Sequence, residues 1–166
     1  MMKRMLPLVL AIVVALPVAT RGQYNPSFGG TWKLTQADPP VPAGRGGGGG
    51  GARGGGIGGP YADTILAQAP DTLMITQSGS QVTVQIGSAK AMYTLDDKTM
   101  SMPEGDVMAL KTRAHWEGAK LHLHYKQGMN WGRDVLSLSG STLTLVRDLE
   151  SGGQSTTRTL TYSKTS

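Results

Sequence analysis

The sequence contains no cysteine and few aromatic residues. Its 166 residues include one Phe, three Trp and five Tyr. Without cysteine, the chain can have no disulfide framework, no thiolate nucleophile and no Cys-ligated zinc, haem or iron–sulfur site. With so few aromatic rings, any hydrophobic core must consist mainly of aliphatic side chains.

The sequence also lacks the motifs of common enzyme classes. It has no Gly-x-Ser-x-Gly elbow, no P-loop and no dinucleotide-binding fingerprint. Its paired acids, Asp96–Asp97 and Glu104 with Asp106, stand beside Gly, Pro or Lys, where turn chemistry explains them. We therefore expect a protein without catalytic activity, and one metal-dependent alternative is described below.

A long apolar segment occurs only near the start of the chain. Lys3 and Arg4 precede the apolar run Leu6–Val18, and small or polar residues follow as far as Gln23. This order is typical of a secretory signal peptide, and the run is shorter than the roughly 20 residues that span a bilayer. We expect residues 1–23 to be a signal peptide, with an uncleaved anchor as the alternative. The mature protein would then be periplasmic or extracellular in a bacterium, with no stable membrane anchor.

Positive and negative charges nearly balance once this segment is removed. The chain carries 16 Lys and Arg against 11 Asp and Glu, a net charge of +5. Loss of Lys3, Arg4 and Arg21 with the signal peptide lowers that net charge to +2. So small a charge argues against a nucleic-acid partner.

Residues 37–70 form a segment rich in proline and glycine. Its central part, Ala43–Pro60, holds 12 glycines in 18 residues. Such a segment cannot bury enough apolar surface to offset the entropy of ordering it. We expect a flexible insertion within a single domain, between a first strand region at 24–36 and the remainder at 71–166.

The remainder alternates apolar and polar residues with a period of two. Leu73 and Ile75 alternate with polar neighbours, and Val82 and Val84 repeat the pattern after the turn signal Ser78–Gly79–Ser80. This period indicates half-buried β-strands. We count eight or nine strands with short connections. The pattern predicts an all-β, antiparallel up-and-down meander that closes into a lipocalin-like barrel, with a β-sandwich as the alternative.

The first strand carries a recognisable motif. Phe28-Gly29-Gly30-Thr31-Trp32-Lys33-Leu34 resembles the opening of the calycin barrels, which include the lipocalins and the fatty-acid-binding proteins. It also resembles a group of small exported bacterial proteins that open with Phe-x-Gly-x-Trp-x-Leu. The resemblance implies that Gly30 and Trp32 form a structural plug of the barrel. It further implies a basic residue over the plug, for which Arg158 is the candidate and Arg147 the rival.

Two features depart from these families. The Pro- and Gly-rich insertion stands where the fatty-acid-binding proteins carry a helical pair. Their carboxylate-binding Arg-x-Tyr is absent, because Arg158 and Tyr162 are four residues apart.

The resemblance implies that the barrel binds a small apolar or amphipathic molecule. Alternating apolar residues are the candidates for the pocket wall: Leu73, Ile75, Val82, Val84, Tyr93, Leu110, Trp116, Leu121, Leu123 and Tyr125. A completely filled barrel would give the same pattern. In that alternative the protein is a structural or interaction module of the cell envelope, with Trp131 and Tyr61 as contact residues.

The three histidines of the chain form a candidate metal site. If Gly118–Ala119 is a two-residue hairpin turn, His115 lies directly opposite His122, and His124 shares their face. The pattern resembles the three-histidine zinc geometry of the carbonic anhydrases. Glu117 is the one carboxylate expected nearby. A zinc-binding protein or zinc enzyme is therefore a further alternative. Apart from zinc in that alternative, we expect no cofactor, because Met100-Ser101-Met102, a possible Cu(I) motif, is better explained as core filler.

Overall fold

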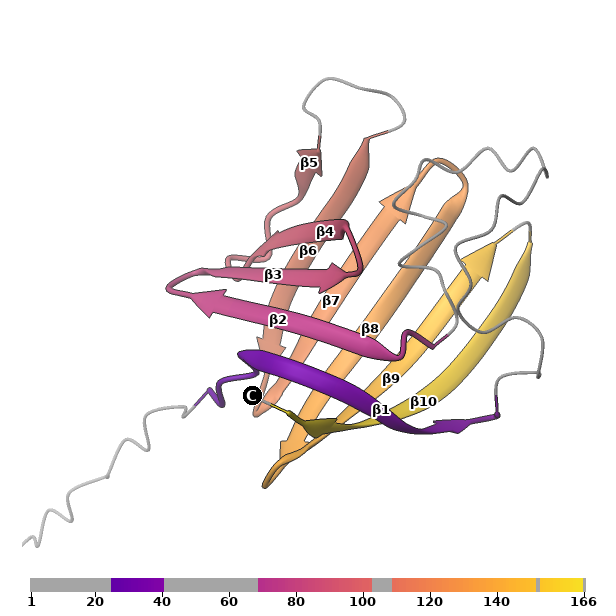
Figure 1. Cartoon of the computed structure of the whole chain (residues 1–166). Coiled ribbons are helices and arrows are strands. Elements are labelled where there is room, and N and C mark those ends of the chain that lie inside the picture. Colours follow the sequence, from indigo (N-terminus) through magenta and orange to yellow (C-terminus); the bar gives the residue numbers. More distant parts are fainter. Residues whose placement is uncertain (1–24, 41–68, 103–108, 152, 166) are drawn as a thin grey trace, which may run out of the picture.

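The computed structural model describes residues 25–40, 69–102, 109–151 and 153–165. The predicted signal peptide, most of the predicted insertion and Tyr61 lie outside these residues. The described residues form one antiparallel sheet (Figure 1). Its ten strands are β1 (Gly30–Asp38), β2 (Thr72–Ser78), β3 (Gln81–Ile86), β4 (Ala89–Thr94), β5 (Met100–Met102), β6 (Leu110–Glu117), β7 (Lys120–Gln127), β8 (Asn130–Ser139), β9 (Thr142–Ser151) and β10 (Gln154–Lys164). No helix in this part of the chain has the length and apolar character needed to cross a membrane.

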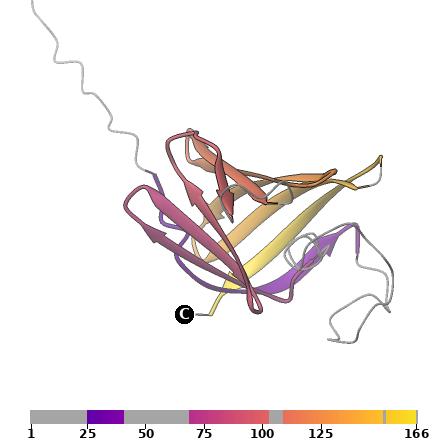
Figure 2. The ribbon, with the colours of Figure 1, turned by 90° about the horizontal axis from the view of Figure 1, so that it is seen from above.

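The sheet is an up-and-down meander closed on itself. The strand order is β4-β3-β2-β1-β10-β9-β8-β7-β6-β5, so every pair is consecutive in the chain except β1 with β10. Strands β1–β4 cross in front of β6–β10 at a steep angle, and the view from above shows the two layers facing each other (Figures 1 and 2). The predicted all-β meander is confirmed, as a nearly closed barrel.

The barrel closes between β4 and β6 without a continuous ladder. The Thr112 hydroxyl donates to the carbonyl of Met92 at 2.5 Å. The Asp97 amide, in the turn after β4, donates to the carbonyl of Ala114 at 3.1 Å. These long-range bonds connect the two ends of the sheet.

The strand count and the strand ends differ from the expectation. Ten strands are present rather than eight or nine, because β4 and the three-residue β5 are separate strands. β1 continues to Asp38, two residues into the range expected to be insertion. The strand count differs where sequence alternation is weak, since β4 reads Ala-Lys-Ala-Met-Tyr-Thr, with small residues at two inward or partly buried positions.

Five of the connections are two-residue hairpin turns with the same chemistry. Each has glycine at its first central position with φ near +60° and a second residue that does not have positive φ. Glycine is the favoured residue at that position of a type II′ turn, whose twist matches that of the flanking strands. The five glycines are Gly79, Gly87, Gly118, Gly128 and Gly140.

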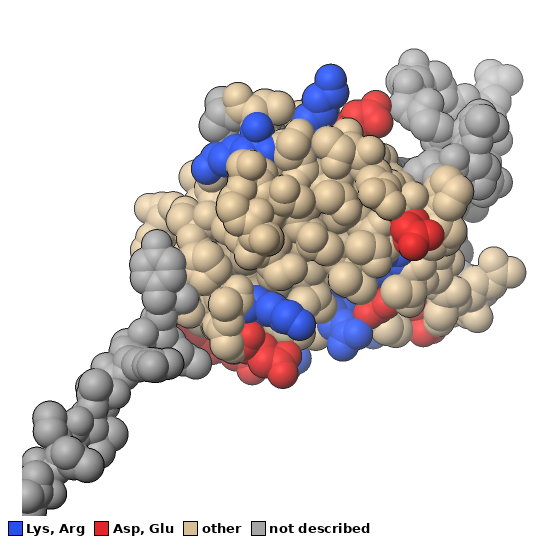
Figure 3. All heavy atoms as spheres, turned by 90° about the horizontal axis from the view of Figure 1, so that it is seen from below, with Lys and Arg blue, Asp and Glu red and all other residues tan. Residues whose placement is uncertain are grey.

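The outer surface is polar and mixed in charge. Outward positions of β10 carry hydroxyl side chains, among them Thr157, Thr159 and Thr161. On the face drawn in Figure 3, Lys and Arg alternate with Asp and Glu around a largely uncharged centre. This face therefore has no extended patch of one sign.

Candidate functional site

The predicted pocket wall lies inside the barrel. Nine of its ten residues are at most 5% exposed and belong to one hydrophobic cluster, namely Leu73, Ile75, Val82, Val84, Tyr93, Leu110, Leu121, Leu123 and Tyr125. Trp116, the tenth, is partly buried against the same cluster and stacks on Phe28 with ring centroids 5.7 Å apart. Because successive side chains of a strand point to opposite faces, the period-two pattern brings these residues together from five different strands.

A buried polar network lies within this apolar interior. Arg147 on β9 donates from Nε to Asp134 Oδ1 at 2.8 Å and from Nη2 to Asp134 Oδ2 at 2.7 Å. The Tyr125 hydroxyl donates to the same Oδ1 at 3.3 Å. All three side chains are nearly inaccessible to solvent. Arg147 and Asp134 have the bidentate geometry that makes Arg–carboxylate interactions strong.

The network shifts the pKa values of its members. Burial raises the pKa of Tyr125 well above its ordinary value, and the Asp134 carboxylate raises it further. Burial opposes the charge of Arg147, but the Asp134 carboxylate outweighs it and raises the pKa of Arg147. Over the physiological range, therefore, the phenol is neutral and the guanidinium is charged.

A second arginine lies beside this network. Arg158 on β10 is the register partner of Arg147 and is 6% exposed. Among the described residues, the buried charges of the interior are two guanidinium groups and one carboxylate. These three described side chains together carry one more positive charge than negative charge. Tyr162, on the same face of β10, donates its hydroxyl to the carbonyl of Pro70 at 3.2 Å.

The sequence analysis overlooked Asp134 as a member of the interior. The position of each residue in the alternating strand pattern could have indicated that it points inward. Asp134 stands two residues before the buried Leu136, and Arg147 stands two residues after the buried Leu145. A charged side chain at an inward position breaks the apolar pattern and looks like a surface residue. The pairing of β8 with β9, which sets Asp134 opposite Arg147, resolves that ambiguity.

Trp32 is held at one end of the barrel. Its side chain is 1% exposed, and its indole N–H donates to the carbonyl of Phe28 at 2.9 Å. The cation observed over its ring is Lys164, whose Nζ lies 5.6 Å from the ring centroid. Arg158 was expected in that position, but it instead lies opposite Arg147. The basic residue over the tryptophan does come from the last strand.

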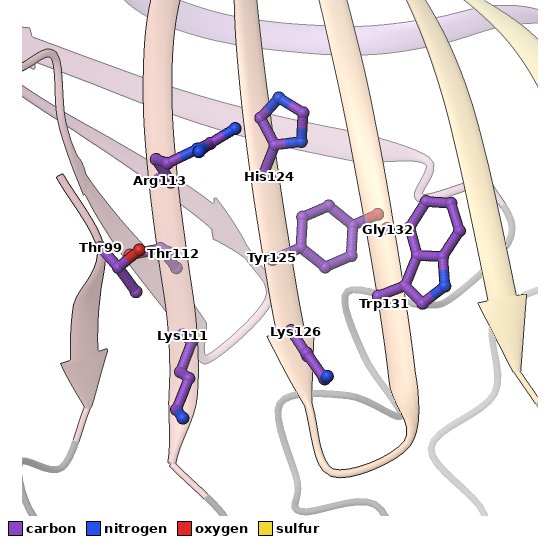
Figure 4. Close-up of a pocket in the computed structure, with 9 residues that line it drawn as sticks. All are labelled: Thr99, Lys111, Thr112, Arg113, His124, Tyr125, Lys126, Trp131 and Gly132. Atoms are coloured by element: carbon purple, nitrogen blue, oxygen red, sulfur yellow. The ribbon is translucent and has the colours of Figure 1, made fainter. Parts of the chain in front are cut away.

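A groove of about 300 Å³ adjoins the buried network (Figure 4). Three of the side chains that line it are basic: Lys111, Arg113 and Lys126. No carboxylate is among its lining residues in the described part of the chain. Tyr125, which contacts Asp134 inside the barrel, also lines the groove. The groove therefore links a basic surface to the interior network.

The histidine hairpin has the predicted register. Glu117 pairs with Lys120 and His115 with His122, which confirms the two-residue turn. The ring of His115 stacks on that of His122 with centroids 4.9 Å apart and on that of His124 at 5.5 Å. One nitrogen from each of the three rings lies within 4.8 Å of the others.

Two carboxylates, rather than the one expected, lie beside these rings. Glu117 Oε2 is 2.9 Å from His122 Nε2, and Asp97 Oδ1 is 3.3 Å from His115 Nδ1, both outside hydrogen-bonding geometry. Burial lowers the pKa of His122, and the neighbouring His115 lowers it further. Burial likewise lowers the pKa of His124. These two rings therefore favour the neutral form near neutral pH.

Comparisons with known proteins find similarity in fold but not in sequence family. No protein-family model matches the sequence, and no curated protein matches it significantly. An abundant heat soluble (SAHS) protein of Ramazzottius varieornatus superposes with a TM-score of 0.51 at 12% identity, over 83% of this chain and 95% of that one. Apo lipid binding protein 8 of Caenorhabditis elegans gives 0.50 at 14% identity, over the same shares of the two chains. The likeness, together with the nearly closed meander, shows that the chain has the calycin-like barrel fold that its first strand indicated.

Proposed function

We propose that the barrel binds one small amphipathic molecule, with an apolar chain and an anionic group, and does not transform it chemically. The observation that carries this proposal is the pair of buried arginines, Arg147 and Arg158, within an apolar interior. The apolar chain of the ligand would pack against the apolar side chains of the interior, and its anionic group would contact the arginines.

The charge balance of the interior favours an anionic group. A buried cation loses its hydration, and this loss is offset only by a nearby anion or by hydrogen-bond acceptors. Asp134 neutralises Arg147 through two hydrogen bonds. A ligand carboxylate near the two buried guanidinium groups would interact with them more strongly than it would in water.

The basic groove supports the same choice of ligand. Lys111 and Lys126 create a positive field next to Tyr125, and Arg113, which pairs with Asp97, lines the same groove. Such a field raises the local concentration of anions and speeds their association. We assign the groove to the approach of the ligand and the interior to its binding.

The fold and the start of the chain extend the proposal. One protein of similar structure is named a lipid binding protein. A barrel of this size either fills its interior with side chains or holds one small ligand there. The charged, apolar and small-residue regions before Gln23 support export. We propose that the protein binds its ligand outside the cytoplasm.

The test compares two probes of equal chain length that differ in their head group. Dodecanoate and dodecanol are titrated into the purified mature protein, and binding is measured by calorimetry and native mass spectrometry. We expect one dodecanoate per chain and at least tenfold weaker binding of dodecanol. Arg158→Gln should reduce this preference to less than threefold, because it removes one of the two buried guanidinium groups that can make charge-assisted hydrogen bonds to a carboxylate.

Arg133→Gln is the matched control. Arg133 is an exposed arginine on the outer face of β8, where it pairs with Asp148 at 3.1 Å. This variant should keep the wild-type preference for dodecanoate. If Arg158→Gln does not fold, Arg158→Lys, which keeps the positive charge, is measured in its place. Equal affinity for the two probes would overturn the anionic part of the proposal. Failure of both probes to bind would favour the filled barrel as an interaction module.

A further inference from the structure

A separate cluster of reactive side chains lies on the outer face of hairpin β6–β7. All three histidines of the chain belong to it: His115, His122 and His124. The inward residues of the same two strands belong to the hydrophobic core, so the cluster and the interior site lie on opposite faces of the sheet. We propose that these three histidines bind one Zn²⁺ ion, with Asp97 and Glu117 as supporting carboxylates.

The positions of the rings suit a single ion. One nitrogen from each ring lies within 4.8 Å of the other two. Zinc holds imidazole nitrogens at about 2.0–2.1 Å, which in a tetrahedral site places them roughly 3.4 Å apart. The rings stand nearly parallel, at 17° and 19° to one another. Rotation of the side chains about their own bonds would bring the nitrogens to that spacing while the strand backbone stays in place.

The ring nitrogens also lack hydrogen-bond partners. Nδ1 of His115 and Nε2 of His122 and His124 are inaccessible to solvent and make no hydrogen bond. Buried polar atoms in proteins are nearly always satisfied, and an unsatisfied one calls for an explanation. Three such atoms on three adjacent rings have a single explanation if the rings coordinate a common ion.

The two carboxylates complete the site. Asp97 Oδ1 lies 3.3 Å from His115 Nδ1, and Glu117 Oε2 lies 2.9 Å from His122 Nε2. Because these are the same nitrogens that lack hydrogen bonds, each carboxylate lies beside the proposed ion, where one of its oxygens can fill the fourth tetrahedral position. Asp97 comes from the turn after β4, and its amide donates to the Ala114 carbonyl of β6, which anchors it beside the hairpin.

The nearby cations are largely compensated. Arg113 Nε lies 3.2 Å from Asp97 Oδ1, and Arg133 Nε donates to Asp148 Oδ2 at 3.1 Å. Lys120 stands opposite Glu117 across the hairpin. Arg113 and Arg133 thus each have a carboxylate beside them, which reduces their repulsion of a dication.

The donor set favours zinc among the common metals. Imidazole suits Zn²⁺, Cu²⁺ and Ni²⁺, whereas Ca²⁺ and Mg²⁺ require oxygen ligands. Three histidines leave a fourth tetrahedral position, which a water molecule or a carboxylate oxygen can fill. The proposed ligand is therefore Zn²⁺, and Zn²⁺ alone is the probe.

The test is calorimetric titration of ZnCl₂ into the chelator-treated mature protein. We expect saturable binding of one ion per chain. His122→Gln and His124→Gln should each weaken it by at least 100-fold. Asp97→Asn should weaken it by about 10–100-fold, the range seen when a metal site loses a supporting carboxylate. Asp96→Asn is the matched control: this neighbour pairs with Lys98 at 3.3 Å, so the variant should bind as the wild type does.

A further variant, His115→Gln, and a magnetic resonance measurement test the same proposal. His115 is the most exposed ring that pairs with a carboxylate, so His115→Gln is the variant least prone to unfold. The ring proton signals of the remaining histidines report zinc directly by nuclear magnetic resonance. Absence of one-to-one binding, or equal binding by the wild type and His115→Gln, overturns the proposal. His115 belongs neither to the interior cluster nor to the lining of the groove, so the result for His115→Gln is independent of the amphipathic ligand.

Discussion

At residue scale, the lack of a side chain at Gly132 leaves room for the Tyr125 ring, which belongs to the buried network. Gly132 on β8 pairs with Tyr125 on β7, and the tyrosine ring crosses directly over the glycine. A methyl group at position 132 would overlap the ring carbons and the hydroxyl oxygen of Tyr125. The glycine is therefore needed for space, since its φ is not in the left-handed region.

We predict that Gly132→Ala lowers the free energy of unfolding by about 1–3 kcal/mol, the usual cost of overpacking a core. The displaced phenol would also lose its hydrogen bond to Asp134. Chemical denaturation of the wild type and the variant measures the change. The same substitution should cost much less in a Tyr125→Ala background. An equal cost in both backgrounds would show that the clash is not the cause.

The interior network also shows what sequence alone could not supply. Arg147 was noticed only as a rival cover for the barrel plug, and Asp134 was not noticed at all. Their bidentate contact depends on two strands pairing in one register, which brings residues 13 positions apart together. Asp97 beside His115 is a similar case, because a turn after β4 meets β6 only when the barrel closes.

At the scale of elements, hairpin β6–β7 was predictable almost completely. The apolar residues Ala114 and Leu123 had to share one face, and Gly118 had to occupy the turn. These two requirements leave one register, which also fixes the relative positions of the histidines. Weakly alternating strands such as β4 gave no comparable constraint, and their ends were not predicted.

The turn itself can be tested. Gly118 has φ of +59° and open space around the position of a Cβ atom. We predict that Gly118→Ala lowers the free energy of unfolding by about 1–2 kcal/mol, because an L-residue is strained at this φ. Gly118→Asn should cost less, since Asn tolerates this region better. Thermal and chemical denaturation measure both variants, and an alanine variant as stable as the wild type would refute the argument.

At the scale of the whole molecule, the barrel depends on a neutral phenol at two interior positions. Burial raises the pKa of Tyr125 well above its ordinary value of 10.0, and burial likewise raises that of Tyr162. In the unfolded chain both phenols would ionise near pH 10. The folded state thus binds two protons that the unfolded state releases, and alkaline conditions favour unfolding.

We predict that the stability contributed by these two phenols is fully present below pH 10 and is lost as the pH rises through the folded pKa values. Denaturation midpoints measured at stepwise higher pH should fall above pH 10, and tyrosinate absorbance should rise together with the loss of β-sheet circular dichroism. Tyr162→Phe removes one ionisable group and one hydrogen bond to Pro70. Its stability should therefore be lower at neutral pH but decline less steeply in alkali. Independent titration of all tyrosines near pH 10, before any unfolding, would contradict the burial of these two side chains as the cause.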